Sequence, residues 1–200
     1  MTLYENRQRF EKLSVKIGAI FSRLGLSPNQ WTLLSIIPAF VALYFLVKSE
    51  FLLAAIFFIA SAFLDMVDGA VARVMGKVTK LGAYLDTMVD RYVEALIVLG
   101  LLFVNLPGFY LPANAWLFLY FMGSMMTTYA KSAAKEKELV EKELKGGILE
   151  RAERLILLFV GILLAIQDPL YLTYMLVLLA VLANISALQR MHIAKKGSGK

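Results

Sequence analysis

The sequence of 200 residues contains no cysteine, so disulfide bonds and thiolate metal sites are excluded. Its first 25 residues are charged and interrupted, without the apolar run of a signal peptide, and no cleaved leader is expected. No internal repeat or low-complexity segment stands out. These absences predict a single domain over residues 1–192, and the terminal Lys-Lys-Gly-Ser-Gly-Lys predicts a disordered tail over 193–200.

Apolar side chains are what the sequence has in excess. They make up 60% of the residues, and the mean hydropathy of +0.69 is far above that of a soluble domain. A helix of about 20 apolar residues spans a bilayer. The sequence therefore predicts an all-α integral membrane protein with six transmembrane helices, over residues 31–48, 51–73, 84–106, 112–134, 148–167 and 169–190.

Residues 1–25 have the pattern of an amphipathic helix. Apolar residues recur there at helical spacing with basic residues between them: Leu13, Ile17, Ile20, Phe21 and Leu24. This pattern predicts a juxtamembrane helix lying on the membrane surface. A helix docked on the rest of the protein fits the same pattern equally well.

The basic residues are distributed unevenly about the predicted spans. When span ends are counted with their nearest loop, every lysine and arginine except Lys48 falls on one side. The positive-inside rule then predicts a multi-pass protein of the cell membrane with both termini in the cytoplasm. The net charge of +6 follows this asymmetry, and no nucleic-acid partner is expected.

Four aspartates stand near the loop that joins the second and third spans. Asp65 and Asp68 are three residues apart, and Asp86 and Asp90 are four apart, so each pair shares a helix face. The connection is short, which allows the two pairs to face each other. Four carboxylates at the edge of hydrocarbon would repel one another and be costly to desolvate. Divalent cations remove that conflict, and oxygen ligands favour Mg²⁺ or Mn²⁺.

Two other interpretations of the aspartates stay open at this point. Aspartates near the end of a span can simply be solvated, although the paired spacing argues against this. Intramembrane acids also occur in metal-ion and proton transporters. The lack of a repeat and the confinement of the acids to one side argue against a transporter.

The residues around these aspartates form a long motif, Asp-x-x-Asp-Gly-x-x-Ala-Arg, eight residues, then Gly-x-x-x-Asp-x-x-x-Asp. The matching positions are Asp65, Asp68, Gly69, Ala72, Arg73, Gly82, Asp86 and Asp90. The sequence thereby resembles the CDP-alcohol phosphotransferases over nearly its whole length. This resemblance implies a homodimeric enzyme, active at the cytoplasmic side of the membrane. Such an enzyme moves a phosphatidyl-type group from a CDP-linked lipid to the hydroxyl of a small alcohol, and CMP leaves.

The resemblance also implies roles for individual residues. Asp65, Asp68 and Asp86 would hold two divalent cations, and Asp90 would complete the second metal site and act as the base. The nucleotide would be bound by Pro28, Asn29, Thr32, Asp68, Gly69, Ala72, Arg73, Thr79 and Gly82. Ser27 and Pro28 are in addition a helix-start signal.

A group of basic residues bears on the identity of the alcohol. Arg151 and Arg154 share a helix face, and Lys131 and Arg190 lie near span ends on the same side as the aspartates. A dianionic phosphate on the acceptor would account for several fixed cations. The run Gly-Gly-x-x-Glu-Arg-x-Glu-Arg that ends at Arg154 resembles the phosphoinositol branch of the family, which implies that these four residues bind the phosphate of inositol phosphate. Bacterial members of that branch often carry an arginine where this chain has Ala133.

Several alternatives accompany this assignment. The acceptor could be glycerol phosphate, or a second inositol unit could be supplied as CDP-inositol. The lipid could be diacylglycerol or archaeol, with a slight lean towards archaeol from the Glu/Lys-rich loop. Arg151 and Arg154 could instead pair with Glu150 and Glu153. Arg91 is expected to snorkel to the interface, and Glu94 has no assigned role.

Overall fold

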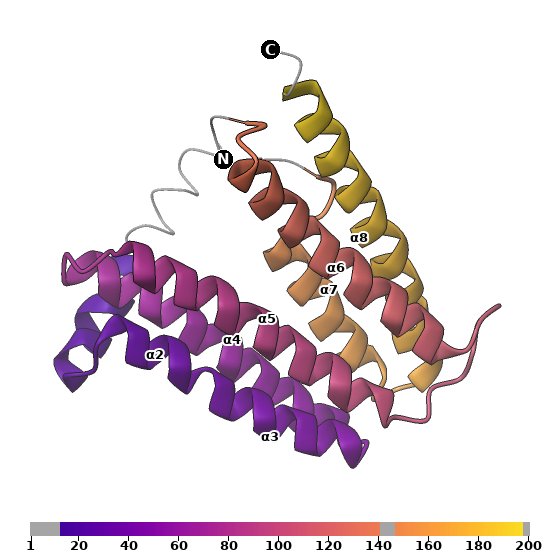
Figure 1. Cartoon of the computed structure of the whole chain (residues 1–200). Coiled ribbons are helices and arrows are strands. Elements are labelled where there is room, and N and C mark those ends of the chain that lie inside the picture. The colour runs from indigo at the N-terminus through magenta and orange to yellow at the C-terminus, as the bar shows by residue number, and fades with distance from the viewer. Residues whose placement is uncertain (1–12, 141–146, 198–200) are drawn as a thin grey trace, which may run out of the picture.

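The computed structural model describes residues 13–140 and 147–197, and nearly all their secondary structure is helical. The helices form two groups that are inclined to each other (Figure 1). The first group comprises α2 (Pro28–Leu34), α3 (Ile36–Val47), α4 (Phe51–Val74) and α5 (Lys80–Leu102). The second comprises α6 (Ala113–Glu136), α7 (Arg151–Leu164) and α8 (Pro169–Gly197). Contacts of α4 with α7 and of α5 with α6 join the two groups.

The helices occur where the apolar runs predict them, and three segments are long and apolar enough to cross a membrane. These are Pro28–Val47, which combines α2 and α3, Phe51–Val74 and Pro169–Lys196. The segment Pro28–Val47 begins as predicted. Ser27 and Gln30 form a capping box, and Pro28 occupies the first turn, where its missing N–H has no helical partner to lose.

Several predicted boundaries differ from the structure; for example, the span predicted over residues 84–106 is the helix Lys80–Leu102. The helix predicted from residue 148 begins at Arg151, because Glu150 and Glu153 cap it reciprocally, with the Glu150 amide 2.7 Å from Glu153 Oε2. The disordered tail predicted from residue 193 is wrong for residues 193–197, since α8 continues to Gly197. The reason is a tertiary contact, because Ala194 on α8 is buried together with Ala134 on α6.

The N-terminal segment is helical over residues 13–21 and continues into η1 (Ser22–Leu24). It is docked on α4, because Gly18 is buried so closely that an added Cβ would lie 2.4 Å from the carbonyl oxygen of Ala70. The ring of Phe21 packs edge-on against Trp31 at a centroid distance of 5.3 Å. Residues 1–12 of the predicted surface helix lie outside the described part of the chain.

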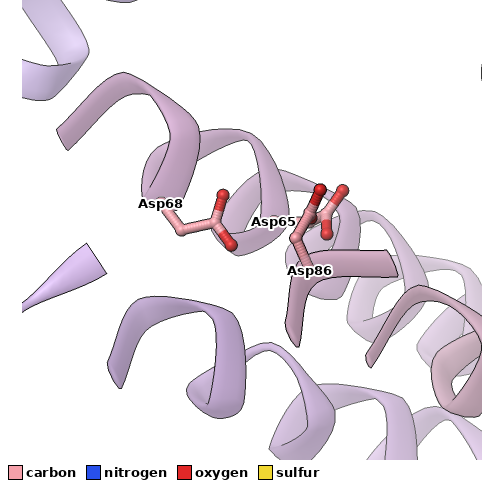
Figure 2. A group of neighbouring side chains, drawn as sticks. All are labelled: Asp65, Asp68 and Asp86. Carbon is pink, nitrogen blue, oxygen red and sulfur yellow. The ribbon is translucent and has the colours of Figure 1, made fainter. Parts of the chain in front are cut away.

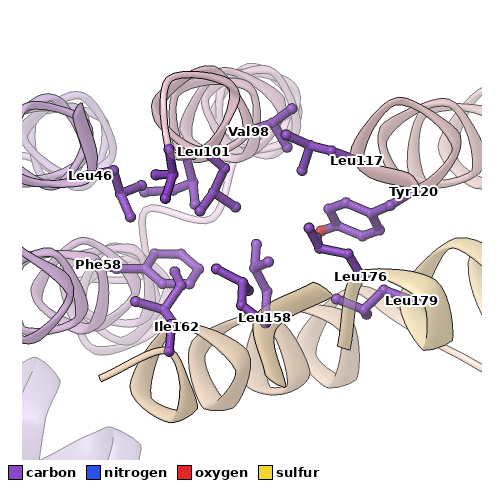
Figure 3. Packing of buried hydrophobic residues seen from close by; sticks show 14 of the residues in the cluster. Leu46, Phe58, Val98, Leu101, Leu117, Tyr120, Leu158, Ile162, Leu176 and Leu179 are labelled. Atoms are coloured by element: carbon purple, nitrogen blue, oxygen red, sulfur yellow. The ribbon is translucent and has the colours of Figure 1, made fainter. Parts of the chain in front are cut away.

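The largest apolar core joins the two helix groups. Leu46, Phe58 and Leu101 of the first group meet Leu117 and Leu158 of the second (Figure 3). α3 and α5 approach closely here, since a Cβ added to Gly100 would lie 2.9 Å from Leu46. Leu46, Leu101 and Leu117 stand at the ends of their helices away from the aspartates, which leaves the polar side chains to gather at the other end.

Candidate active site

Three of the four predicted metal ligands form a compact group. Asp65 and Asp68 lie on successive turns of α4, and Asp86 lies on the first turns of α5. Each offers a carboxylate oxygen, and these three oxygens all lie within 4.8 Å of one another. Figure 2 shows the carboxylates turned toward a common point. An oxygen-only ligand set at this spacing fits a hard divalent cation such as Mg²⁺ or Mn²⁺.

Asp68 is held in place by a residue of a different helix. It is 6% exposed, and its carboxylate accepts a hydrogen bond from the hydroxyl of Thr32, which is 3% exposed. The same hydroxyl lies 3.2 Å from the carbonyl oxygen of Pro28 in its own helix. Thr32 therefore orients Asp68, which is a contact that the sequence did not predict.

The fourth aspartate, Asp90, lies next to the group and has a basic partner. Its carboxyl is 8% exposed and neighbours that of Asp65. Arg151 bridges the two, with Nη1 3.2 Å from Asp65 Oδ2 and Nη2 in an ion pair with Asp90 Oδ1. Arg151 thus does form an ion pair, but with these aspartates and not with the predicted Glu150 or Glu153.

A cavity of about 370 Å³ opens beside the carboxylates, which is sufficient for a nucleotide-sized ligand. All nine residues predicted to bind the nucleotide line it, and the sequence missed Lys77, Val78 and Ala83 in the same wall. Lys77 could have been suspected, because it is a basic residue in the loop between two residues of the motif, Arg73 and Gly82. Asp68 and Asp86 belong to the wall as well, so the cavity and the candidate metal site are continuous.

Short side chains shape this cavity. The hydroxyl of Thr79 caps α5 by accepting a hydrogen bond of 3.0 Å from the amide of Gly82. A Cβ added to Gly82 would lie 3.1 Å from Thr79 Oγ1 and 3.2 Å from Asn29 Oδ1, so the motif glycine permits a close approach of two helices. The guanidinium of Arg73 lies over Gly69 and donates a 2.7 Å hydrogen bond to Ser14 of the N-terminal helix.

The other predicted cations lie deeper, at the ends of α6, α7 and α8. Arg154 is 2% exposed, and its one hydrogen bond among the described residues goes to the carbonyl oxygen of Leu149, at 3.3 Å. Its Nε is buried without a partner. Arg190 lies close enough to interact electrostatically with Arg154 and donates a 2.9 Å hydrogen bond to the carbonyl oxygen of Thr127. Lys131 is half-buried on α6.

Arg91 and Glu94 form a buried polar network, so the predicted snorkelling of Arg91 is wrong. Its Nη1 lies 2.7 Å from Glu94 Oε2, and the side chains are only 14% and 1% exposed. The hydroxyls of Tyr120 and Ser124 donate to Glu94 Oε1 at 2.8 and 2.5 Å. The reason is that α6 packs against this face of α5 and offers two hydroxyls, one of which also accepts a hydrogen bond from Arg91.

A family model describing CDP-alcohol phosphatidyltransferase matches residues 26–186. This range includes the clustered aspartates and every residue that lines the cavity. The chain belongs to this family. Family membership removes the transporter interpretation, and the fold, an all-helical membrane-protein architecture, is that of solved members.

Two of the proteins that this chain resembles are synthases of inositol phosphate lipids. The chain is 36% identical over 183 residues to an archaetidylinositol phosphate synthase of Pyrococcus horikoshii, covering 90% of each chain. It is 30% identical over 203 residues to a phosphatidylinositol phosphate synthase of Mycobacteroides abscessus, covering 97% of this chain and 89% of the relative.

Two crystal structures of the phosphatidylinositol phosphate synthase of Mycobacterium tuberculosis are similar to this CDP-alcohol phosphatidyltransferase. Each superposes with a TM-score of 0.80 at 28% identity. The structure with CDP-DAG bound covers 92% of this chain and is itself covered to 94%. The structure in complex with manganese and citrate covers 91% and is covered to 88%.

Proposed function

We propose that this enzyme transfers a phosphatidyl-type group from a CDP-linked lipid to inositol phosphate, releasing CMP and forming a phosphoinositol-lipid phosphate. The observation that carries the proposal is the arrangement of three parts. A nucleotide-sized cavity adjoins the cluster of carboxylates, and Arg151 contacts two of these carboxylates from α7, which also carries the buried Arg154. The names of the similar proteins support the same reaction.

The carboxylates are proposed to hold two divalent cations, Mg²⁺ or Mn²⁺. Asp65, Asp68 and Asp86 supply oxygen ligands within a common 4.8 Å, and Asp90 adjoins them. Manganese in one similar crystal structure supports this assignment. Bound there, the cations would neutralise the pyrophosphate and the negative charge that builds on the departing CMP.

The cavity is proposed to bind the cytidine diphosphate part of the donor. Asn29, Thr79 and the small residues Gly69, Ala72 and Gly82 line it, which allows a planar base and a ribose to approach the backbone. Arg73 projects a guanidinium at the wall, where it can form two parallel hydrogen bonds to a phosphate. Bound in this way, the pyrophosphate would reach the carboxylates Asp68 and Asp86 in the same wall.

Asp90 is proposed to accept the proton of the attacking inositol hydroxyl. It lies one turn further along α5 than Asp86, between the donor cavity and the cations of α7. Its ion pair with Arg151 orients the carboxylate, and the bridge from Arg151 to Asp65 keeps that orientation relative to the metal ligands. A base held in this way can collect a proton from an acceptor on the cation side.

The phosphate of the acceptor is proposed to bind Lys131, Arg151, Arg154 and Arg190. Arg154 is the residue with the strongest support, because among the described residues its buried guanidinium makes one long hydrogen bond, and such a group is costly unless an anion completes its shell. Glycerol phosphate also carries a phosphomonoester, so the same cations would bind it. An assay with each acceptor supplied separately distinguishes it from inositol phosphate.

The placement in the membrane is proposed from the sequence and the helix pattern. The six helical segments α2–α3, α4, α5, α6, α7 and α8 would cross the cell membrane as six spans, with the N-terminal helix at the surface. One domain would extend from residue 1 to the end of α8. Both termini and the active site would face the cytoplasm, and the enzyme would act as a homodimer on a diacylglycerol- or archaeol-based donor.

The test is the release of CMP by the purified protein in detergent, with Mn²⁺ or Mg²⁺ and either CDP-archaeol or CDP-diacylglycerol. Inositol phosphate, inositol, glycerol phosphate and CDP-inositol are supplied one at a time. Release that requires inositol phosphate is expected, and Arg154→Ala should raise the KM for it by about 100-fold, the effect of losing a charge-assisted hydrogen-bonding group of ~3 kcal/mol. Release with inositol alone at the same rate would contradict the proposed acceptor.

A further inference from the structure

Glu94 is the centre of a polar network that connects α5 with α6. Its carboxylate is 1% exposed and receives hydrogen bonds from Tyr120 and Ser124 on one oxygen. The other oxygen faces Arg91 Nη1 at 2.7 Å. Arg91 itself donates to the hydroxyl of Ser124 at 3.3 Å, which closes the network. A carboxylate held by three groups has one defined orientation.

The network adjoins the proposed phosphate-binding cations. Arg154 interacts electrostatically with Glu94, Tyr120 and Arg91, and also with Arg190. Arg154 has no side-chain hydrogen bond among the described residues, and the Nε atoms of Arg154 and Arg91 are both buried without partners. Among the described residues, the carboxylate of Glu94 is therefore the negative charge that faces both Arg91 and Arg154.

Glu94 also shares a helix face with the proposed base, Asp90. It is four residues after Asp90, so both side chains lie on one face of α5 one turn apart. The hydrogen bonds of Tyr120 and Ser124 to Glu94 therefore tie α5 to α6 one turn beyond Asp90.

We propose that Glu94 is a positioning residue for the acceptor site: it holds Arg154 and Arg91 in place so that the guanidinium of Arg154 meets the acceptor phosphate. Glu94 itself touches no substrate. The inference rests on the proposed function, because it assigns Arg154 to the phosphate of the acceptor. It deepens that function by naming the residue on which the affinity for the phosphate depends.

Two effects of removing the carboxylate oppose each other. Without its negative charge the pocket becomes more positive, which by Coulomb attraction alone would strengthen phosphate binding. Without the carboxylate, Arg91 loses its ion pair, and Arg91 and Arg154 repel each other without the opposite charge of Glu94 beside them. Directional bonds to a phosphate depend on placement to within a fraction of an ångström, so positioning is expected to prevail.

The experiment compares Glu94→Gln and Glu94→Asp with the wild-type enzyme in detergent. Glu94→Gln removes the charge, and Glu94→Asp keeps the charge but withdraws it by one methylene. Both are expected to raise the KM for inositol phosphate by about 10-fold or more, as the loss of a supporting hydrogen-bond shell does elsewhere. The KM for the CDP-lipid and the affinity for Mn²⁺ should change less than about twofold, within the scatter of remote substitutions.

The controls separate a local role from a general one. Glu50→Gln removes an exposed acid at the start of α4, which makes no capping hydrogen bond, and should leave both KM values unchanged. If Glu94→Gln does not yield folded protein, Tyr120→Phe and Ser124→Ala, which each remove one hydrogen bond to Glu94, are expected to raise the acceptor KM about threefold, corresponding to the loss of ~0.7 kcal/mol.

Three results would overturn the inference. An acceptor KM that falls in Glu94→Gln and is unchanged in Glu94→Asp would assign Glu94 to charge balance alone. Equal increases in the KM values of donor and acceptor would assign it to stability alone, and an unchanged acceptor KM would remove any role. If the wild-type enzyme used another acceptor and not inositol phosphate, the proposed function itself would be contradicted. The measurement on the wild-type enzyme shows this independently of the variants.

Discussion

The hydroxyl of Thr32 on α2 donates a hydrogen bond to the carboxylate of Asp68 on α4. Both side chains are buried, and both line the nucleotide-sized cavity. The contact joins the start of the first long apolar segment to the candidate metal site. Thr32 therefore orients a candidate metal ligand, in addition to its proposed contact with the nucleotide.

Replacing Thr32 by valine keeps the shape and removes this hydrogen bond. The affinity for Mn²⁺ is expected to fall about 10-fold or more, because partners that orient a metal ligand contribute to that extent. Titration of Mn²⁺ followed by electron paramagnetic resonance measures the change. Thr173→Val is the matched control, since Thr173 is also buried and donates 2.7 Å to the carbonyl oxygen of Pro107 at the other end of the protein. Equal Mn²⁺ affinity in Thr32→Val and wild type would contradict the role.

Replacing Asp86 by asparagine tests the metal site through stability. Mn²⁺ at 100 times its Kd should stabilise the wild-type protein by about 2.7 kcal/mol and raise its melting temperature. Asp86→Asn should lose this shift, because one of the three clustered carboxylates is gone, while its melting temperature without metal stays the same or rises as repulsion is relieved. Asp168→Asn, at the start of α8, should keep the shift. A full Mn²⁺ shift in Asp86→Asn would place the metal elsewhere.

Replacing Gly82 by alanine should separate activity from stability. The added Cβ would lie 3.1 Å from Thr79 Oγ1 and 3.2 Å from Asn29 Oδ1, both in the wall of the cavity. The KM for the CDP-lipid is expected to rise by about 10-fold, as the displacement of wall groups by a fraction of an ångström can cause. Helix stability should not suffer, because alanine is favoured over glycine by about 1 kcal/mol within a helix.

Gly69→Ala is the comparison for that variant. Its Cβ would meet Arg73 Nη1 at 3.4 Å, which is an ordinary contact with the end of a flexible side chain. A smaller rise in the donor KM is expected than for Gly82→Ala. The donor KM is measured from CMP release at varied concentrations of CDP-lipid. A larger rise in Gly69→Ala than in Gly82→Ala would show that the wall near Asn29 does not contact the donor.

Replacing Gly18 by alanine tests the docking of the N-terminal helix. The Cβ would lie 2.4 Å from the backbone oxygen of Ala70, so the helix must shift, at a cost of about 1–3 kcal/mol. The melting temperature should fall, and the donor KM should rise because Arg73 loses its contact with Ser14. Ser14→Ala should reproduce only the rise in KM. A melting temperature unchanged in Gly18→Ala would contradict this docking.

The sequence alone determined the family, the positions of the helices and most of the residues that line the cavity. Long apolar runs can be read directly because hydrocarbon requires about 20 apolar residues per span. The motif aspartates and glycines carry chemistry that depends on their spacing along two neighbouring helices, so their grouping could be predicted without coordinates. All nine predicted nucleotide residues line one cavity for the same reason.

Only the tertiary structure decided which partners these residues have. Thr32 with Asp68, Arg151 with Asp65 and Asp90, and the network around Glu94 each join residues that are remote in sequence or that have several candidate partners. Side-chain pairing of this kind depends on how helices rotate about their axes and cross one another, which apolar periodicity does not encode. Arg91 illustrates the limit, since a basic residue near a span end predicts snorkelling, whereas the packing of α6 against α5 buries it on Glu94.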